Sequence, residues 1–250
     1  MVKKPGVDYD HRTAQPLHSV DGAKEGLRTI FPAEFPRTVL DVGCGTGSWL
    51  RAALNLGAEE VLGIDGAEIP PGLLHVASEN IRTADLGSPL DLGRRFDLVL
   101  CLETAEHLEP EQAGVLADSL VRHGDLILFS AAAPGQDGIH HVNLQWPSYW
   151  QKLFNDRGFA CSDAVRWSIW ENPRIEPWYR QNMMMVSRNE KLAGTEPRIL
   201  PVLHPEVVAA WGRIWDDAKA IENGTLPLGW YAAVPFKAAL AKVRRFTSGK

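Results

Sequence analysis

Two carboxylates flank a glycine-rich turn in the first half of the chain. The turn begins at Asp41 and contains Gly43, Gly45 and Gly47, and Asp65 ends the next apolar run. Glycines let a backbone turn sharply and approach a ligand more closely than a Cβ atom would allow. An acid about 20 residues beyond such a turn can accept hydrogen bonds from ribose hydroxyls. The spacing therefore predicts a site for a nucleoside-containing ligand.

The order of the acid and the glycines separates two classes of ligand. A dinucleotide-binding turn requires G-x-G-x-x-G, but Ser48 stands where its third glycine would be. Asp41 precedes the first glycine and would repel a pyrophosphate, because like charges in one small site disfavour each other. The same acid would attract a ligand that carries an ammonium or sulfonium group. The pattern therefore favours S-adenosylmethionine over NAD.

Strands that alternate with helices must position these residues. Apolar runs predict strands at 38–43, 60–65, 80–85, 97–103 and 124–131, and helices at 46–57, 110–122 and 147–157. The segments 159–167 and 181–188 predict a final antiparallel pair. We therefore expect an α/β fold with a doubly wound, mostly parallel seven-stranded sheet and an antiparallel edge strand.

Three regions are predicted along the chain. Residues 1–36 would form an N-terminal arm or cap, and residues 37–189 the main domain. Residues 190–250 would form a C-terminal helical extension packed on that domain, with an amphipathic helix over 205–222. The apolar stripe of this helix, around Trp211, would dock on the main domain, or serve as a lid or a dimer contact.

Four elements in the same order resemble the class I S-adenosylmethionine-dependent methyltransferases of the small-molecule type. They are the glycine turn, Asp65 in the ribose-binding place, Asp85-Leu86 in the adenine-binding place, and the strand 96–103, whose end lies beside the transferable methyl group. The resemblance covers residues 37–188 and implies S-adenosylmethionine as cofactor and S-adenosylhomocysteine as product. The implied cofactor-binding residues are Asp41, Gly43, Cys44, Gly45, Gly47, Asp65, Gly66, Asp85, Leu86, Cys101 and Glu103.

The acceptor side of the reaction falls on two segments after the fourth and fifth strands. His107 lies just beyond the fourth strand, as a substrate contact or base, or with a purely structural hydrogen bond. The loop at 138–150 adds His140 and His141 as base candidates, because histidine titrates near neutral pH. The expected acceptor contacts are Asn143, Trp146, Tyr149 and Trp150. The alternative is that Asn143 and Gln145 tie the loop down and Trp150 packs in the core.

The sequence does not predict a metal site. Adjacent histidines such as His140 and His141 point in different directions on an extended chain, and no H-x-x-x-H or H-x-H spacing is present. The remaining histidines have no tie to the site and are expected mostly at the surface: His11, His18, His75, His123 and His204. Cys44 and Cys101 are expected to fill tight spaces rather than to react.

Charge and hydropathy limit the partners. The chain has 26 basic and 31 acidic residues, a net charge of −5, and no dense basic run before its tail that would grip a nucleic-acid backbone. No apolar run is long enough for a membrane span, and no export signal follows the first residues. We expect a cytoplasmic enzyme, monomeric or homodimeric, that acts on oxygen or nitrogen of a small organic molecule.

Three other functions stay open on sequence grounds. A methyltransferase of RNA or protein would need a basic groove. A cofactor-binding partner subunit without catalysis would dock through the late helix. A nicotinamide-dependent oxidoreductase is the weakest of the three, because of the position of Asp41.

Overall fold

The computed structural model describes residues 19–136, 138–225, 227–229 and 231–232, and within 211–218 it describes the backbone alone. Contacts divide the chain into two units that meet in sequence between His204 and Pro205. Of the arm predicted over 1–36, residues 1–18 lie outside the described residues, whereas Val20–Ile30 form a helix that buries Ala23 and Leu27. The side chains at 211–218 of the predicted stripe also lie outside the described residues.

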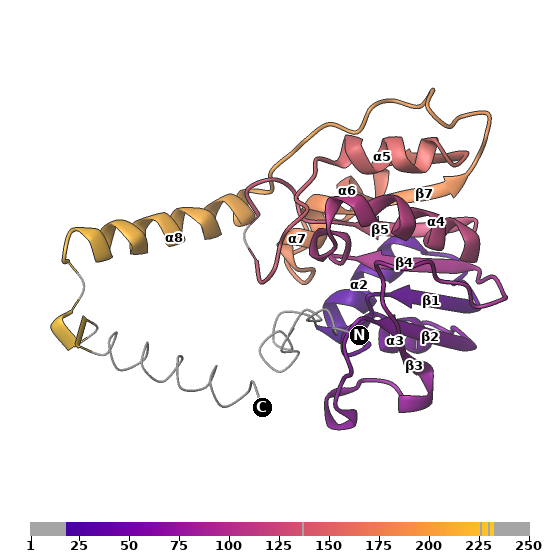
Figure 1. Ribbon diagram of the computed structural model, residues 1–250, viewed down its shortest axis with the longest axis horizontal. Coiled ribbons are helices and arrows are strands. Elements are labelled where there is room, and N and C mark those ends of the chain that lie inside the picture. The colour runs from indigo at the N-terminus through magenta and orange to yellow at the C-terminus, as the bar shows by residue number, and fades with distance from the viewer. Residues whose placement is uncertain (1–18, 137, 226, 230, 233–250) are drawn as a thin grey trace, which may run out of the picture. The chain divides into compact units, whose positions relative to one another are not determined.

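The first unit is built on one seven-stranded sheet of the order β3-β2-β1-β4-β5-β7-β6 (Figure 1). Strands β1 to β5 are parallel, and β7 runs antiparallel between β5 and β6. The strands are β1 (Thr38–Val42), β2 (Glu60–Asp65), β3 (Ile81–Thr83), β4 (Leu98–Leu102), β5 (Leu126–Ser130), β6 (Phe159–Ser162) and β7 (Met184–Arg188). The predicted fold class is confirmed, and β6 takes the edge beside the antiparallel strand.

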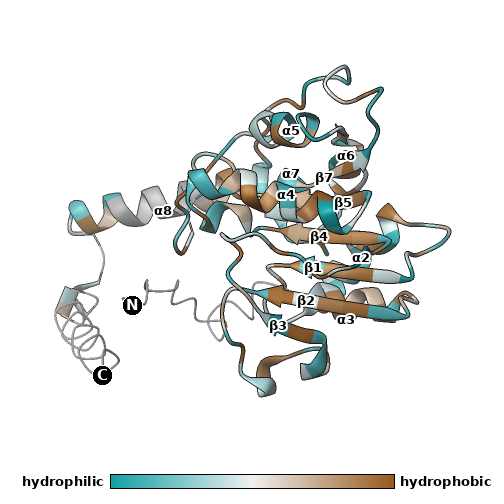
Figure 2. Ribbon diagram, turned by 45° about the vertical axis from the view of Figure 1, so that its right-hand side comes forward, coloured by the Kyte–Doolittle hydropathy of each residue, from teal (hydrophilic) through white to brown (hydrophobic). Residues whose placement is uncertain are grey.

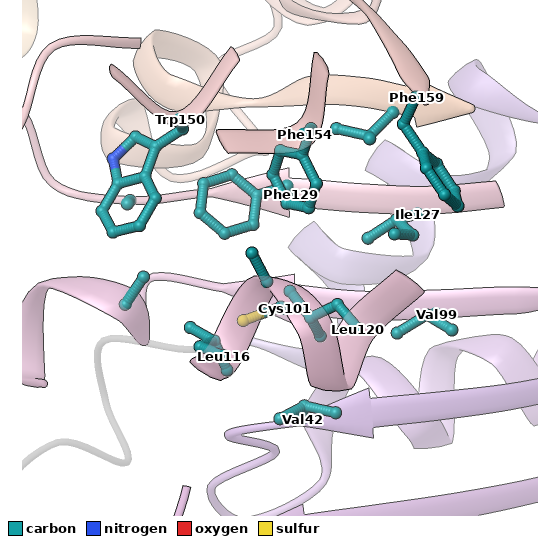
Figure 3. Packing of buried hydrophobic residues seen from close by; sticks show 14 of the residues in the cluster. Val42, Val99, Cys101, Leu116, Leu120, Ile127, Phe129, Trp150, Phe154 and Phe159 are labelled. Atoms are coloured by element: carbon teal, nitrogen blue, oxygen red, sulfur yellow. The ribbon is translucent and has the colours of Figure 1, made fainter. Parts of the chain in front are cut away.

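Helices cover the sheet on both faces. They are α2 (Val20–Ile30), α3 (Ser48–Asn55), α4 (Ala113–His123), α5 (Pro147–Asn155), α6 (Ala164–Ile169) and α7 (Pro177–Asn182). Side chains of α4 and α5 join one apolar cluster, in which the Phe129 ring centroid lies 5.2 Å from those of both Trp150 and Phe154 (Figure 3). Side chains of α2, α3, α6 and α7 join the second cluster.

This double coverage explains the apolar strands. A parallel strand with helices on both faces has no polar side, and every residue of β4 is buried. The strands accordingly form the most hydrophobic layer of the unit (Figure 2). Short 3₁₀ turns at Ala105–His107 (η4) and Pro110–Gln112 (η5) follow β4, and η5 leads directly into α4.

The segment after β6 differs from the prediction of a strand over 159–167. Apolar residues alternate there, which is a strand pattern, but the chain turns into α6 instead. Packing buries Arg166 and Ile169, which are three residues apart and share one helix face, and it leaves Trp167 52% exposed. The predicted strand 181–188 is likewise shorter, because its first residues end α7.

Two histidines expected at the surface are buried. The His123 ring lies wholly in the interior, where Nδ1 donates to the Ser119 carbonyl (2.6 Å) and Nε2 accepts from the Leu92 amide (2.9 Å). His204 is 4% exposed, and its ring packs on Trp170 at 4.5 Å. The His204 Nε2 atom lies 3.0 Å from the Trp170 carbonyl oxygen, so backbone groups hold both rings.

The second unit contains the helix α8 (Pro205–Glu222), as the sequence predicts. None of the helices in the described parts of the chain is both long and apolar enough to cross a lipid bilayer.

Candidate functional site

The carboxyl ends of β1, β2, β4 and β5 lie at one edge of the sheet. The parallel register pairs Val42 with Ile64 and Leu102 with Ser130. The glycine turn after β1, Asp65 at the end of β2 and Glu103 after β4 therefore meet at this edge (Figure 1). Open α/β sheets bind their ligands here, outside the carboxyl ends of the strands.

The glycine turn is held in a left-handed conformation. Gly43, Gly45 and Gly47 have φ angles of 84°, 49° and 80°, which residues other than glycine rarely adopt. The amide of Gly43 donates to the Ile64 carbonyl at 2.7 Å. A Cβ atom on Gly43 would lie 2.1 Å from Oγ1 of Thr104. The backbone of the turn is thus fixed against both neighbouring strands, and α3 begins directly after it.

Asp65 lies against the same turn. Its carboxylate accepts hydrogen bonds from the backbone amides of Gly45 (2.8 Å) and Ala67 (2.9 Å). The residue is 8% exposed. A carboxylate only accepts hydrogen bonds, which suits a ligand that presents hydroxyl groups. Gly66, the next residue, is exposed and has open space where a Cβ would be.

Asp41 is almost wholly buried beneath the turn, at 2% exposure. Burial, and next the negative charge of Asp65, raise the pKa of Asp41 to about 8. A carboxyl in this state is neutral at pH 7 until a positive charge approaches it.

The predicted adenine-binding residues lie beyond β3. Leu86 is buried, and Asp85 is exposed. The Asp85 carboxylate accepts from the Gly87 amide (3.0 Å) and the Ser88 hydroxyl (2.8 Å), so its own loop orients it.

Glu103 anchors a cluster of amide side chains that sequence reasoning missed. Its backbone has a φ of 50°, and its carboxylate accepts from Gln136 Nε2 (2.9 Å) and Asn182 Nδ2 (3.1 Å). Gln181 Nε2 in turn donates to Gln136 Oε1 at 3.2 Å. Burial raises the pKa of Glu103 to about 7, against the lowering effect of the Asn182 hydrogen bond. Asn182 and Gln181 escaped notice because their segment was expected to be a strand.

The cysteines near the turn behave as packing residues. Cys44 and Cys101 are buried, at 6% and 0% exposure, and burial raises the pKa of both thiols well above the usual range. Neither is a reactive thiolate at neutral pH.

Two of the candidate histidines lie together on the acceptor side. The rings of His107 and His141 make an edge-to-face contact with 5.0 Å between centroids. Burial, and then the His141 ring, lower the pKa of His107 to about 4, so this ring is neutral at pH 7. His140 is exposed and has a left-handed φ of 59°. Glu106, which the sequence analysis did not assign to the site, lies wholly buried beside His107 and His141.

The four predicted acceptor contacts have different surroundings. Trp150 is 2% exposed and packs in the core (Figure 3), and Asn143 is 1% exposed. Trp146 is 38% exposed at the start of α5, and Tyr149 is half-buried. Trp146 and Tyr149 therefore have surface that a ligand could contact.

The fold is a doubly wound α/β sheet with a glycine turn and an aspartate at its carboxyl edge. The chain belongs to the methyltransferase-domain family, whose model matches residues 18–152. The resemblance recognised from the glycine turn, Asp65, Asp85-Leu86 and the fourth strand is thereby confirmed.

Curated relatives match part of the chain. A ubiquinone biosynthesis O-methyltransferase of Acinetobacter baumannii is 35% identical over 104 residues, which are 38% of this chain and 43% of the relative. The enzyme of the same description from Cereibacter sphaeroides is 29% identical over 161 residues, 56% of this chain and 65% of the relative. The chain thus spans about half the length of these relatives.

Solved structures share the fold. The sugar N-methyltransferase KedS8 from Streptoalloteichus aligns with a TM-score of 0.56 and 15% identity, over 76% of this chain and 96% of its own. Magnesium protoporphyrin IX methyltransferase from Synechocystis, with bound S-adenosylhomocysteine, aligns with a TM-score of 0.51 and 22% identity, over 76% and 90% of the two chains.

Proposed function

We propose that this chain is an S-adenosylmethionine-dependent methyltransferase that transfers a methyl group to oxygen or nitrogen of a small organic acceptor. The observation that carries the proposal is the Asp65 carboxylate, held by the Gly45 amide against a left-handed glycine turn at the carboxyl edge of the sheet. This arrangement suits the ribose of a nucleoside.

The residues at the edge fit the parts of the cofactor in turn. Asp41 offers its carboxyl to the ammonium of the methionine part, and the turn from Gly43 lies close enough for backbone contact. Asp65 accepts from the ribose hydroxyls, and Asp85 with Leu86 faces the adenine. The bound sulfonium supplies the reactive methyl group, and the protein aligns the acceptor with it.

The acceptor would lie near His107 and His141. His107 is neutral at pH 7 because of its lowered pKa, so its ring adds no charge on the acceptor side. Trp146 and Tyr149 provide partly exposed aromatic surface on the adjoining helix, which suits a small apolar or aromatic molecule. The net charge of −5 disfavours a nucleic-acid substrate. The O-methyltransferase relatives and the N-methyltransferase fold neighbour support acceptors of these two kinds.

Formation of S-adenosylhomocysteine, measured by chromatography, tests the activity. The full chain is incubated with S-adenosylmethionine and a panel of phenols, carboxylic acids and amino sugars. We expect product that depends on at least one acceptor, with Asp65→Ala much slower and the exposed Asp91→Ala unchanged. A chain that binds the cofactor but releases no product with any acceptor would instead support the partner-subunit alternative.

A further inference from the structure

Three potential metal ligands lie together just beyond the end of strand β4. Glu106 and His107 lie in η4, and His141 lies in the loop between β5 and α5. One carboxylate oxygen and one nitrogen from each ring all lie within 4.8 Å of one another. The sequence predicts no metal for His107, His140, His141 and Glu103, because adjacent histidines diverge and no H-x-x-x-H spacing is present. The fold instead brings His141 to Glu106 and His107 from a distant segment.

Glu106 lacks the partners that a buried carboxylate requires. The residue has no exposed surface, and its side-chain oxygens meet only the backbone amides of Glu106 itself and Ala132, without a hydrogen bond of full geometry among the described residues. An ionised carboxylate buried in this way costs several kcal/mol unless a cation or hydrogen-bond donors compensate it. A cation bound between Glu106 and the two rings would provide that compensation.

Backbone groups orient both rings for ligation. The Nδ1 of His141 lies 2.9 Å from the carbonyl oxygen of Gln136. A carbonyl can only accept, so Nδ1 carries the hydrogen and the lone pair of the neutral ring is on Nε2. The carbonyls of Ile139 and His140 interact with the His107 ring. Metal-binding histidines are commonly oriented in this way, with one ring N–H on a carbonyl.

The loop that carries His141 is fastened to η4. The amides of Val142 and Asn143 both donate to the backbone carbonyl of Glu106, at 2.9 and 3.1 Å. At Gly138, a Cβ atom would lie only 2.3 Å from the His141 ring, so the loop closes around the ring without a side chain. These contacts hold the three groups together before any ligand arrives.

We propose that Glu106, His107 and His141 bind a single Zn²⁺-type divalent ion. Two imidazoles and one carboxylate are a usual donor set for zinc, and three protein ligands leave a coordination position open. In a role that rests on the proposed function, this position would take the acceptor's oxygen and lower the pKa of its hydroxyl.

Zinc binding by the full chain tests the site without any need for activity. The protein is treated with EDTA, dialysed, and titrated with Zn²⁺ in competition with a chromophoric chelator. We expect one equivalent to bind. Glu106→Gln and His141→Ala should each weaken binding by at least ~100-fold, since the loss of outer-shell partners alone weakens metal binding by 10–100-fold.

His140→Asn is the matched control, because it removes the adjacent histidine and asparagine tolerates a left-handed φ. It should keep the zinc affinity of the unchanged chain. Cooperative thermal unfolding of each variant shows that it is folded. The proposal is overturned if the folded chain binds no stoichiometric zinc, or if Glu106→Gln binds it as tightly as the unchanged chain. Neither result depends on whether the chain transfers methyl groups.

Discussion

Replacement of Gly43 by alanine should lower stability more than replacement of an exposed glycine that has open space around it. The added Cβ would lie 2.1 Å from Oγ1, 2.3 Å from Cγ2 and 2.7 Å from Cβ of Thr104. Rotation of the Thr104 side chain does not move the Cβ of Thr104, so it cannot relieve the contact between that atom and the added Cβ. The backbone of one of the two segments must therefore move. The φ of Gly43 is also 84°, which adds strain for any residue with a Cβ.

Substitutions at two other glycines measure the cost of the left-handed backbone separately from the cost of the steric contact. Gly57 has a φ of 106° but open space around it, and Gly66 has open space and no positive φ. We expect Gly57→Ala to lower the free energy of unfolding by about 1–2 kcal/mol, the cost of a left-handed alanine. Gly66→Ala should be close to neutral. Gly43→Ala should add an overpacking cost of about 1–3 kcal/mol to the left-handed cost.

Urea unfolding of the three variants measures these free energies. A second substitution, Thr104→Gly, should restore part of the stability of Gly43→Ala, because it removes the side chain that the new Cβ meets. If Gly43→Ala were no less stable than Gly57→Ala, or if Thr104→Gly gave no recovery, the close approach of the turn to β4 would be refuted.

Further predictions concern the buried groups. The pKa of Asp41 is raised from 3.8 to about 8 in the folded chain, so the folded state binds more protons and the free energy of unfolding should fall as pH rises from about 4 to 8. In urea unfolding at several pH values, Asp41→Asn should flatten this decline. An unchanged slope in the variant would contradict the prediction. Trp150→Ala should lower the free energy of unfolding by about 3–5 kcal/mol, since its ring packs in the core, and a KM increase without loss of stability would restore it as an acceptor contact. Asn182→Ala should raise the pH at which the contribution of Glu103 to stability changes, because the Asn182 hydrogen bond lowers the pKa of Glu103. The same pH profile of stability in both proteins would show that Asn182 does not act on Glu103.

Local patterns were enough to predict the central sheet and the cofactor side of the site. The strands up to β5 are apolar runs, and the glycine turn and Asp65 follow strand ends at short range, so their spacing along the chain determines their meeting at one edge. The segment after β6 could not be predicted in this way. Its alternating apolar residues favour a strand, and only tertiary packing of Arg166 and Ile169 decides for α6.

The acceptor side depends on contacts between distant segments. The hydrogen bonds of Glu103 reach Gln136 and Asn182, and the ring of His107 meets that of His141. No periodicity or motif in one segment records which residues another segment will bring to it. The sequence therefore identified His107 and His141 as candidates but gave no sign that the loop of His141 meets the neighbouring pair Glu106 and His107.

Calorimetric titration with S-adenosylhomocysteine shows whether the glycine turn holds a nucleoside site. We predict binding of one equivalent by the full chain. Asp65→Ala should weaken it by about 1.5–3 kcal/mol, the contribution of hydrogen bonds to a charged group, while the exposed Asp91→Ala binds normally. Absence of binding at ligand concentrations of about 1 mM, where a free energy weaker than about −4 kcal/mol would escape detection, would contradict the account.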